Sequence, residues 1–580
     1  MGTRALGRLA NSSHWNRSLA SALLGSRESS FRSGKSLSSS YPVLGTTAGI
    51  FTSTDVVTNQ SSFGRIWVYL ISGVLSWGGI HTSLAEELSA RPSTADNMEQ
   101  EVQLVEDSLQ SSNQASNPHT ARWRIYTDMG RDLFSQGRLD EAEKYFVRAL
   151  EEAKKGFGDR DPHVASSCNN LAELYRMRKE YAKAEPLFLE SVQRLEQALG
   201  PMHESVAFAL HNLAGTYLQQ HNYELARTCY ERSLKIKERK LGPNHPEYAN
   251  TMFHLAEVLR LQGNNVDAEH LIRDSLRILE EGGVGHSQQA VRRMSRLAEI
   301  LVHSGKLQEA EILQRKILHI LEMLQGPESL STITAVDNLA TTLQALRKLD
   351  EAEELFLRCL QVRQKALSST HILVGSTLFK LAVVTTQQAD EMVADKSRSV
   401  EEARMAYERA EDMLRQAIRI AEQRWEEALG GVAAADQAAS AMLGTDVSLG
   451  PKALNTLIPP LLALVRSLNA LGIVVMHLAD LAGSPVAAKE RTQEAERVLR
   501  HCLTLLDKPP GIAQDLVEVP ELQREYVSCL HHLAALLVRT KDQGSSENNK
   551  SAEEQAARLL SRAEGIEASH AARIQANLSN

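Results

Sequence analysis

Residues 169–191 read NNLAELYRMRKEYAKAEPLFLES, and this stretch decides the fold. The small residues Ala172 and Ala184 let two helices approach closely. Tyr175 and Phe188 supply the large side chains that fill the space beside that contact. The segment 179–181 stands between the two apolar groups, where a tight turn is needed. The stretch therefore predicts two antiparallel helices joined by a short turn.

The same pattern recurs every 42 residues along the chain. Leucines stand at 171, 213, 255, 297, 339 and 381, and each is followed by alanine. A second series with the same period is Ala142, Ala184, Ala226, Ala268, Ala310 and Ala352. Glycines that would end the second helices recur at Gly158, Gly200, Gly242 and Gly326, although Val284 and Ser368 interrupt this series. A fixed period of about 20 to 50 residues indicates a solenoid in which each hairpin packs on the next.

These residues also resemble a known family. Leu171, Ala172, Tyr175, Ala184, Phe188 and Ser191 resemble the tetratricopeptide repeat. The 42-residue period, the segment NNLA at 169–172 and LGPNHP at 241–246 resemble its kinesin light chain subclass. The resemblance covers about residues 121–430. It implies an all-α fold, a right-handed superhelical solenoid of antiparallel helix pairs.

The resemblance also implies a binding groove. In a stack of hairpins the first helices align along one curved face that is open to a ligand. Asparagine suits such a face because its side chain can donate to and accept from a peptide backbone. An alternative interpretation is that the asparagines only cap or solvate helices. The positions implied to face a protein or peptide partner are Asn169, Asn170, Glu173, Arg176, His211, Asn212, Gln219, Asn250, His254, Glu257, Arg260, Arg292, Arg296, Glu299, Asp337, Asn338 and Gln344.

Arg292 and Arg296 are one helical turn apart, so the pair could bind a carboxylate. Chaperone-binding relatives need further Lys and Asn residues in the two preceding repeats. His211, Gly215 and His254 stand at those places here, which disfavours a receptor for chaperone tails.

No catalytic or cofactor site is indicated. The sequence has no GxSxG, HExxH or GxxxxGK[ST] motif. Its five cysteines are scattered and predict buried thiols, not a disulfide framework or a metal site. His203, His245 and His371 share one phase of the repeat, which indicates a structural role at the repeat junctions. We therefore expect no enzyme, no cofactor and no metal, and an enzyme in residues 450–580 is the disfavoured alternative.

The N-terminal region has the composition of an organellar address. Residues 1–40 hold six basic residues and one acid, with abundant serine. This composition favours a mitochondrial transit peptide, with a chloroplast address as the alternative. The apolar stretch 66–80 is shorter than the roughly 20 residues that cross a bilayer. It is a membrane anchor, a sorting signal cleaved near Ala85 or part of the transit region, and the sequence leaves these three open.

The remaining boundaries follow from composition. We predict a transit and sorting segment at 1–85, a disordered linker at 86–120 and seven repeats at 121–429, the last with an inserted loop at 389–399. A flexible Ala/Gly-rich linker is predicted at 430–452, and degenerate capping helices at 453–570.

The sequence thus predicts a scaffold or adaptor of an organelle that binds partner segments in its groove. A cytosolic cargo adaptor related to kinesin light chain is the first alternative. An RNA-binding array is the second, and the charge disfavours it. Residues 86–580 carry 57 basic and 70 acidic side chains, a balance that argues against nucleic acid as a partner.

Overall fold

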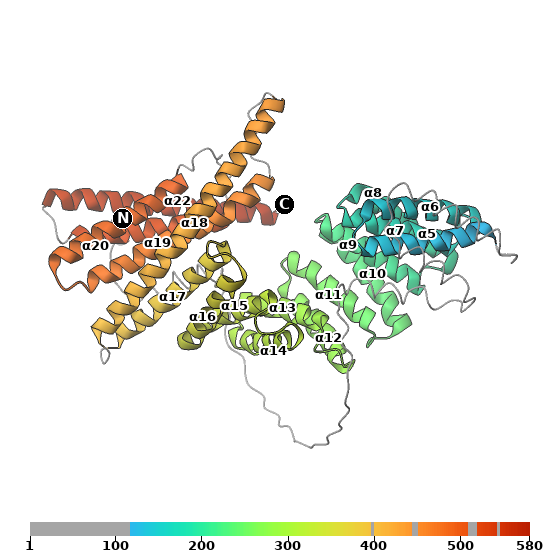
Figure 1. The fold of residues 1–580 in the computed structure, drawn as a ribbon, viewed down its shortest axis with the longest axis horizontal. Helices are drawn as coiled ribbons and strands as arrows, with labels where there is room; N and C mark the ends of the chain where they lie inside the picture. The colour runs from blue at the N-terminus through green and yellow to red at the C-terminus, as the bar shows by residue number, and fades with distance from the viewer. Residues whose placement is uncertain (1–116, 396–398, 444–450, 508–518, 542–545, 580) are drawn as a thin grey trace, which may run out of the picture. The chain divides into compact units, whose positions relative to one another are not determined.

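The computed structural model describes residues 117–395, 399–443, 451–507, 519–541 and 546–579. These residues form eighteen helices and no strand, so the predicted all-α class is confirmed (Figure 1). The transit and sorting segments predicted at 1–85 lie outside the described residues, as does most of the predicted linker. The described helices fall into two compact units, residues 117–286 and 287–579.

The first unit consists of four helical hairpins, and in each the first helix is followed by a second one that packs on it. Its helices are α5 (Pro118–Ser135), α6 (Leu139–Phe157), α7 (Pro162–Met177), α8 (Tyr181–Leu199), α9 (Glu204–Gln219), α10 (Tyr223–Leu241), α11 (Pro246–Leu261) and α12 (Asn265–Glu281). Helix α5 begins inside the linker predicted at 86–120, because Asn117 caps it and Pro118 occupies its first turn.

The second unit continues the hairpins and ends in a helical bundle. Its hairpin helices are α13 (Gln288–His303), α14 (Leu307–Gln325), α15 (Leu330–Ala345), α16 (Leu349–Ala366), α17 (Ile372–Ala394) and α18 (Val400–Leu443). The bundle helices are α19 (Pro451–Asp480), α20 (Pro485–Asp507), α21 (Pro520–Lys541) and α22 (Ser546–Ser579).

Small buried residues hold each hairpin together. Ala172 of α7 and Ala184 of α8 are fully buried, and Phe188 fills the space beside them. Ser191 donates from its Oγ to the carbonyl oxygen of Ala165 at 2.8 Å. The same bond recurs one and two periods later, from Ser233 to Ala207 and from Ser275 to Ala249. The small residues that recur every 42 positions thus mark the places where the two helices of a hairpin pack closely.

The turn inside each of the first six hairpins uses one left-handed residue at a fixed phase. It is glycine in three hairpins, for example Gly263 with φ +84°. In the other three, Lys179, His221 and Arg347 adopt φ +62° although they carry a side chain. A side chain makes this conformation unfavourable, so these three turns are held by the packing of the helices on either side.

The first helices begin at another fixed phase. Each N-cap side chain accepts a hydrogen bond from a backbone N–H two or three residues ahead, which satisfies a group that the helix leaves unpaired. These caps are Asp161, His203, His245, Ser287, Ser329 and His371. The recurring histidines are therefore helix caps.

Two segments differ from their prediction. The insertion at 389–399 was expected to be a loop, but residues 389–394 are helical and belong to α17. Ala389 is buried in the core, and Asp390 accepts a hydrogen bond from Tyr407 Oη of α18 at 2.6 Å. The linker predicted at 430–452 is helical over residues 430–443, since α18 continues to Leu443, and residues 444–450 lie outside the described part of the chain. Residues 432–443 are rich in alanine, the best helix former, and this outweighs Gly430 and Gly431.

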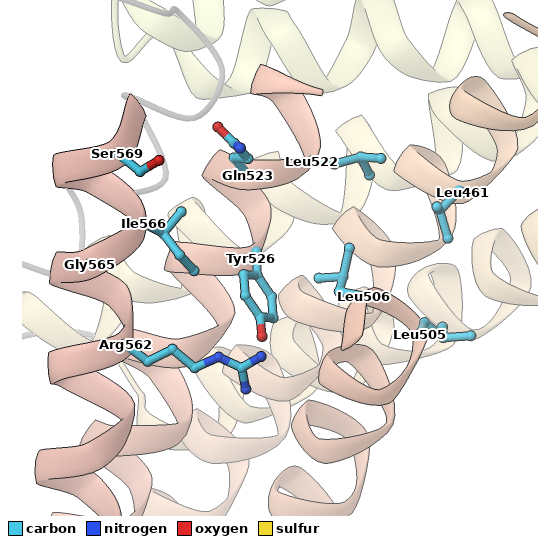
Figure 2. Close-up of a pocket in the computed structure, with 10 residues that line it drawn as sticks. All are labelled: Leu461, Leu505, Leu506, Leu522, Gln523, Tyr526, Arg562, Gly565, Ile566 and Ser569. Atoms are coloured by element: carbon cyan, nitrogen blue, oxygen red, sulfur yellow. The ribbon is translucent and has the colours of Figure 1, made fainter. Parts of the chain in front are cut away.

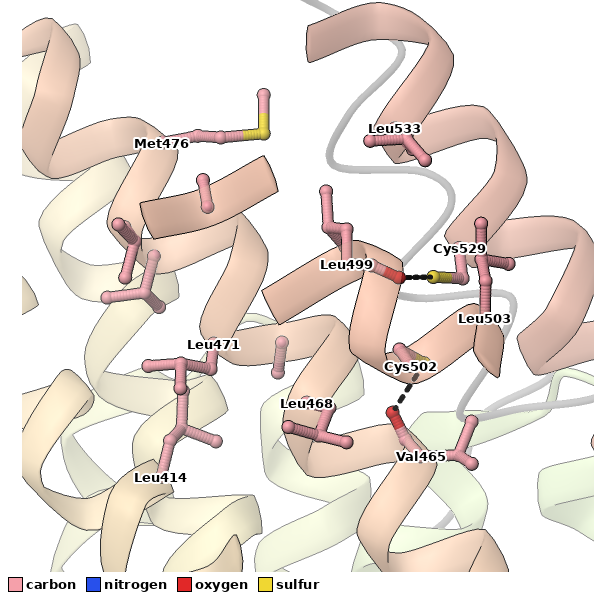
Figure 3. Packing of buried hydrophobic residues seen from close by; sticks show 14 of the residues in the cluster. Leu414, Val465, Leu468, Leu471, Met476, Leu499, Cys502, Leu503, Cys529 and Leu533 are labelled. Carbon is pink, nitrogen blue, oxygen red and sulfur yellow. Dashed lines mark hydrogen bonds between the residues drawn. The ribbon is translucent and has the colours of Figure 1, made fainter. Parts of the chain in front are cut away.

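The core of the bundle is a cluster of buried apolar side chains from α17 to α22, part of which Figure 3 shows. Cys502 and Cys529 belong to it as buried thiols, and each lies against a backbone carbonyl oxygen of a neighbouring helix, Cys502 on Val465 and Cys529 on Leu499. Residues 455–480 of α19 are long and apolar enough to cross a membrane, and 78% of their most apolar window is buried inside the protein. They are accounted for as the central helix of this core.

Candidate partner-binding face

The first helices lie next to one another in the first unit. Helix α7 contacts α9, and α9 contacts α11, in addition to the second helices between them. The side chains implied to bind a partner therefore lie on adjacent helices, and several of them contact each other.

Four contacts join residues that are 43 positions apart on consecutive first helices. We call them the inter-repeat pairs: Asn169–Asn212, His211–His254, Asp337–Lys380 and Gln344–Gln387. Asn212 Nδ2 donates to Asn169 Oδ1 at 3.0 Å. Asn169 and Asn170 are both buried, with 7% of their surface exposed. Asn169 and Asn212 thus connect two repeats, a role that neither capping nor solvation of helices describes.

The His211–His254 pair is part of an aromatic group. Its rings meet edge to face with centroids 5.1 Å apart, and Tyr230 of α10 stacks on His254 at 5.9 Å. Burial lowers the pKa of His211 well below its usual value, and the charge of nearby Lys237 lowers it further. His211 is therefore neutral at physiological pH, with its Nδ1 3.2 Å from Thr251 Oγ1.

Asp337 is held by two cations. Lys380 Nζ donates to its Oδ2 at 2.8 Å, and Arg363 Nη1 lies 3.5 Å from its Oδ1. Asp337 has 9% of its surface exposed. The carboxylate that the resemblance assigns to a partner is thus engaged within the protein.

The arginines on this face pair with acids on their own helices. Arg176 pairs with Glu173, and Arg260 Nη2 lies 2.6 Å from Glu257 Oε1. Arg296 Nη1 lies 2.6 Å from Glu299 Oε2. Arg296 would therefore have to exchange this acidic partner in order to bind a ligand carboxylate together with Arg292. Arg292, Gln219 and Asn338 are exposed, and Asn250 is half-buried.

Two buried cations were missed by the sequence analysis. Lys237 Nζ, with no exposed surface, donates to Thr251 Oγ1 at 3.0 Å and lies 3.2 Å from Glu247 Oε2. Arg363, 126 residues later, donates to Thr377 Oγ1 at 2.6 Å. A signal was present, because both stand at the phase where other repeats have Leu195, Leu279 and Leu321.

Helix α5 carries an acid and a base that are desolvated yet accessible. Asp128 Oδ1 and Arg131 Nη1 are 4.0 Å apart, with 47% and 30% of their side chains exposed. Burial nevertheless raises the pKa of Asp128 and lowers the pKa of Arg131. Neighbouring protein atoms thus partly desolvate both groups although solvent still reaches them. In the described part of the chain, no three His, Cys, Asp or Glu side chains are placed to hold a metal.

Comparisons with known proteins bear on the repeats. A family model described as tetratricopeptide repeat matches residues 123–197 and 205–281, and a second model of that repeat matches 332–373. No curated protein sequence matches the chain.

Solved structures of other helical repeats resemble the chain. One is the kinesin light chain nearly identical TPR-like repeats of Podosopora anserina, with 22% identity and a TM-score of 0.33, covering 36% of this chain and 99% of that one. BtubC (BKLC) from P. vanneervenii has 19% identity and a TM-score of 0.35, covering 39% and 92%. PilF of Pseudomonas aeruginosa has 16% identity and a TM-score of 0.33, covering 44% and 97%.

The family assignment rests on the models of the repeat and on the helix pairs that they match. Residues 123–197, 205–281 and 332–373 are therefore tetratricopeptide repeats.

Proposed function

We propose that the chain is a non-catalytic scaffold that binds a segment of a partner protein along its first helices and serves an organelle, the mitochondrion. The observation that carries the proposal is the layer of first helices, where accessible polar side chains stand at a repeated phase. Asn250, His254 and Glu257 of α11 lie at positions i, i+4 and i+7, which places them on one side of the helix. Tetratricopeptide folds are in general protein-binding scaffolds, which agrees with this role.

The inter-repeat pairs divide the predicted residues into two groups with different roles. Asn169, His211 and Asp337 connect repeats, so substitutions there change the fold of the face as well as its chemistry. Asn250, Arg292 and Asn338 have accessible surface and are better placed to touch a partner. A fair test of binding must therefore use the second group.

Site-specific photocrosslinking in intact cells tests this assignment. A photoreactive amino acid at Asn250, on first helix α11, should form a covalent adduct with a partner. The same amino acid at Lys235, an exposed position on second helix α10, is the matched control. We expect adducts at 250 and at 338 but not at 235. The proposal is contradicted if positions 235 and 250 are labelled equally, or if neither position 250 nor position 338 forms an adduct.

The organellar assignment needs its own experiment. The full chain carrying a C-terminal fluorescent protein should colocalise with mitochondria. N-terminal sequencing of the purified protein should show that N-terminal residues have been removed, by a cleavage within residues 1–85 or just after them. Colocalisation with chloroplasts would support the alternative address. A diffuse cytosolic signal with an intact N-terminus would instead favour a cargo adaptor of the kinesin light chain type.

A further inference from the structure

The bundle of the second unit contains a cavity of about 360 Å³ between α19, α20, α21 and α22 (Figure 2). Leu461 and Leu522 lie in its wall, and Arg562 is the charged residue among the described residues that line it. The guanidinium of Arg562 lies 5.1 Å from the centre of the Tyr526 ring and is engaged within the protein. A buried polar atom without a partner occurs elsewhere in this unit, on second helix α14.

A second-helix side chain lies beside the inter-repeat pairs at a fixed register. Tyr230 of α10 stands 19 positions after His211 and 24 positions before His254, and its ring lies 5.2 and 5.9 Å from their ring centres. Phe356 of α16 likewise stands 24 positions before Lys380, whose Nζ lies 5.8 Å from the centre of the phenyl ring. This register therefore predicts which two first-helix residues a second-helix side chain meets.

Gln314 of α14 holds the same register position at the junction of α13 and α15. Its first-helix neighbours, by the offsets of 19 and 24, are Ser295 and Asn338. Only 7% of Gln314 is exposed, and its Oε1 is buried without a hydrogen-bond partner among the described residues. Five other hairpins have an aromatic or aliphatic residue at this position: Phe146, Phe188, Tyr230, Ile272 and Phe356. Because an unpaired buried amide oxygen destabilises a fold, packing alone does not explain this glutamine.

The three side chains together suit an uncharged polar group. Ser295 and Asn338 are exposed, so a ligand can reach them. Hydroxyl and carboxamide groups both donate and accept hydrogen bonds, and Gln314 Oε1 lacks a donor. None of the three residues is charged, so none can balance an ion that enters the site. A carboxamide offers a donor and an acceptor without a charge, and it therefore fits.

We propose that Ser295, Gln314 and Asn338 bind an asparagine or glutamine side chain of the partner segment. The NH₂ group of that side chain donates to Gln314 Oε1, and its carbonyl oxygen accepts from Asn338 Nδ2. Gln314 belongs to a second helix and is largely buried, so the group that reaches it projects from the segment as a side chain. This inference rests on the proposed binding of a partner segment along the first helices, and it adds which side chain the segment carries.

Peptide display tests this requirement. Random 12-residue peptides on phage are selected on the immobilised full chain, and we expect Asn or Gln to be enriched at one position. Fluorescence anisotropy with the best synthetic peptide should give a Kd about tenfold higher when that residue is replaced by Leu or Glu. Leucine leaves Gln314 without a donor, and glutamate brings an unbalanced charge. On the Gln314→Leu variant the preference for the amide over leucine should fall to about threefold or less.

Gln314→Leu also separates a lost ligand group from a damaged fold. It places an apolar side chain where other hairpins have one, so its thermal unfolding midpoint should equal or exceed that of the wild type. Gln308→Leu, at an exposed glutamine of the same helix, is the matched control and should keep the tenfold preference.

The outcomes distinguish this inference from the scaffold function. If the wild type selects no peptide, the scaffold function fails and the carboxamide site fails with it. If the selected peptides show no preference for Asn or Gln, or if Gln314→Leu keeps that preference, the scaffold function stands and the carboxamide site is overturned. Water would then complete the hydrogen bonds of Gln314.

Discussion

Asn212 Nδ2 donates a hydrogen bond to Asn169 Oδ1 at 3.0 Å, although the two residues belong to different repeats. The contact joins α7 to α9 directly, without the second helix that lies between them in the sequence. The same offset of 43 positions recurs at His211–His254, Asp337–Lys380 and Gln344–Gln387. Several residues that the family resemblance assigns to a partner thus contact each other within the protein. Their substitution is therefore expected to affect stability as well as partner binding.

Asn169 and Asn212 should be energetically coupled. A double-mutant cycle with Asn169→Ala and Asn212→Ala should give a coupling free energy of about 1 kcal/mol, because each single change leaves the other amide without its partner. Urea unfolding of the four proteins measures it. Asn212→Ala combined with Asn338→Ala, which do not touch, should be additive. A cycle for Asn169 and Asn212 that closes within about 0.3 kcal/mol would show that the bond adds nothing.

Glycine should stabilise the hairpin turn at Lys179. Its φ of +62° is unfavourable for a residue with a Cβ, so Lys179→Gly should raise the free energy of unfolding by up to about 1 kcal/mol. Lys179→Ala removes the charge but keeps the Cβ and should change little. The reverse change, Gly263→Ala, should cost about 1 kcal/mol. Thermal unfolding followed by circular dichroism provides the comparison, and equal effects of Gly and Ala at 179 would refute the explanation.

The two partners of the Lys237–Glu247 ion pair should respond differently to removal. Burial lowers the pKa of Lys237 despite the nearby carboxylate, so its charge is costly to keep. Lys237→Leu restores the residue type of neighbouring repeats and should change stability by less than about 1 kcal/mol. Glu247→Ala leaves the buried ammonium without its acid and should cost roughly 3 kcal/mol.

Urea unfolding at pH 7 distinguishes these cases. Glu224→Ala, an acid in the first turn of α10, controls for the loss of a favourable charge at a helix N-terminus. A larger loss for Lys237→Leu than for Glu247→Ala would mean that the ammonium contributes net stability.

His532 should make the second unit sensitive to acid. Burial lowers its pKa from 6.5 to about 4, and its Nδ1 lies 2.8 Å from Asn469 Oδ1. Between these two pKa values the unfolded chain binds a proton that the folded chain does not, so stability falls as the pH falls from 6.5 towards 4. The loss is about 2 kcal/mol at pH 5 and roughly 3 kcal/mol when the pH reaches 4.

A His532→Gln variant isolates this contribution. Urea unfolding from pH 7 to pH 4.5 should show a shallower loss of stability for the variant than for the wild type, with the largest difference below pH 6. Parallel curves for the two proteins over this range would show that His532 is not the group responsible.

The hairpins were predictable because their determinants are local and periodic. A close helix contact is indicated by residue type alone at Ala172, Ala184 and Phe188. The spacing between Ala172 and Ala184 then predicts the turn that joins the two helices. The ends of α17 and α18 were not predicted, because Asp390 finds its partner Tyr407 only after folding and because helix propensity overrides Gly430 and Gly431. Element boundaries depend on such competing effects more than on the repeat itself.

The candidate face was predicted only in part. Family resemblance placed Asn169, His211 and Asp337 on the first helices, but the pairing of these residues depends on a neighbour 43 positions away. That distance in the chain becomes a contact only once the repeats have stacked. The buried cation Lys237 was visible as a charged residue at a leucine position, and the same reading applies to Arg363.

The inter-repeat pairs make the order of the hairpins part of the design. Each pair needs one member from either side of a junction, so a hairpin carries half of the contact for the hairpin before it and half for the one after it. Exchanging two hairpins of equal length would keep the period but could place Asn169 opposite His254, or His211 opposite Asn338. At the junctions that carry these pairs, the side chains of neighbouring repeats therefore specify which hairpin follows which, although the hairpins share one backbone pattern.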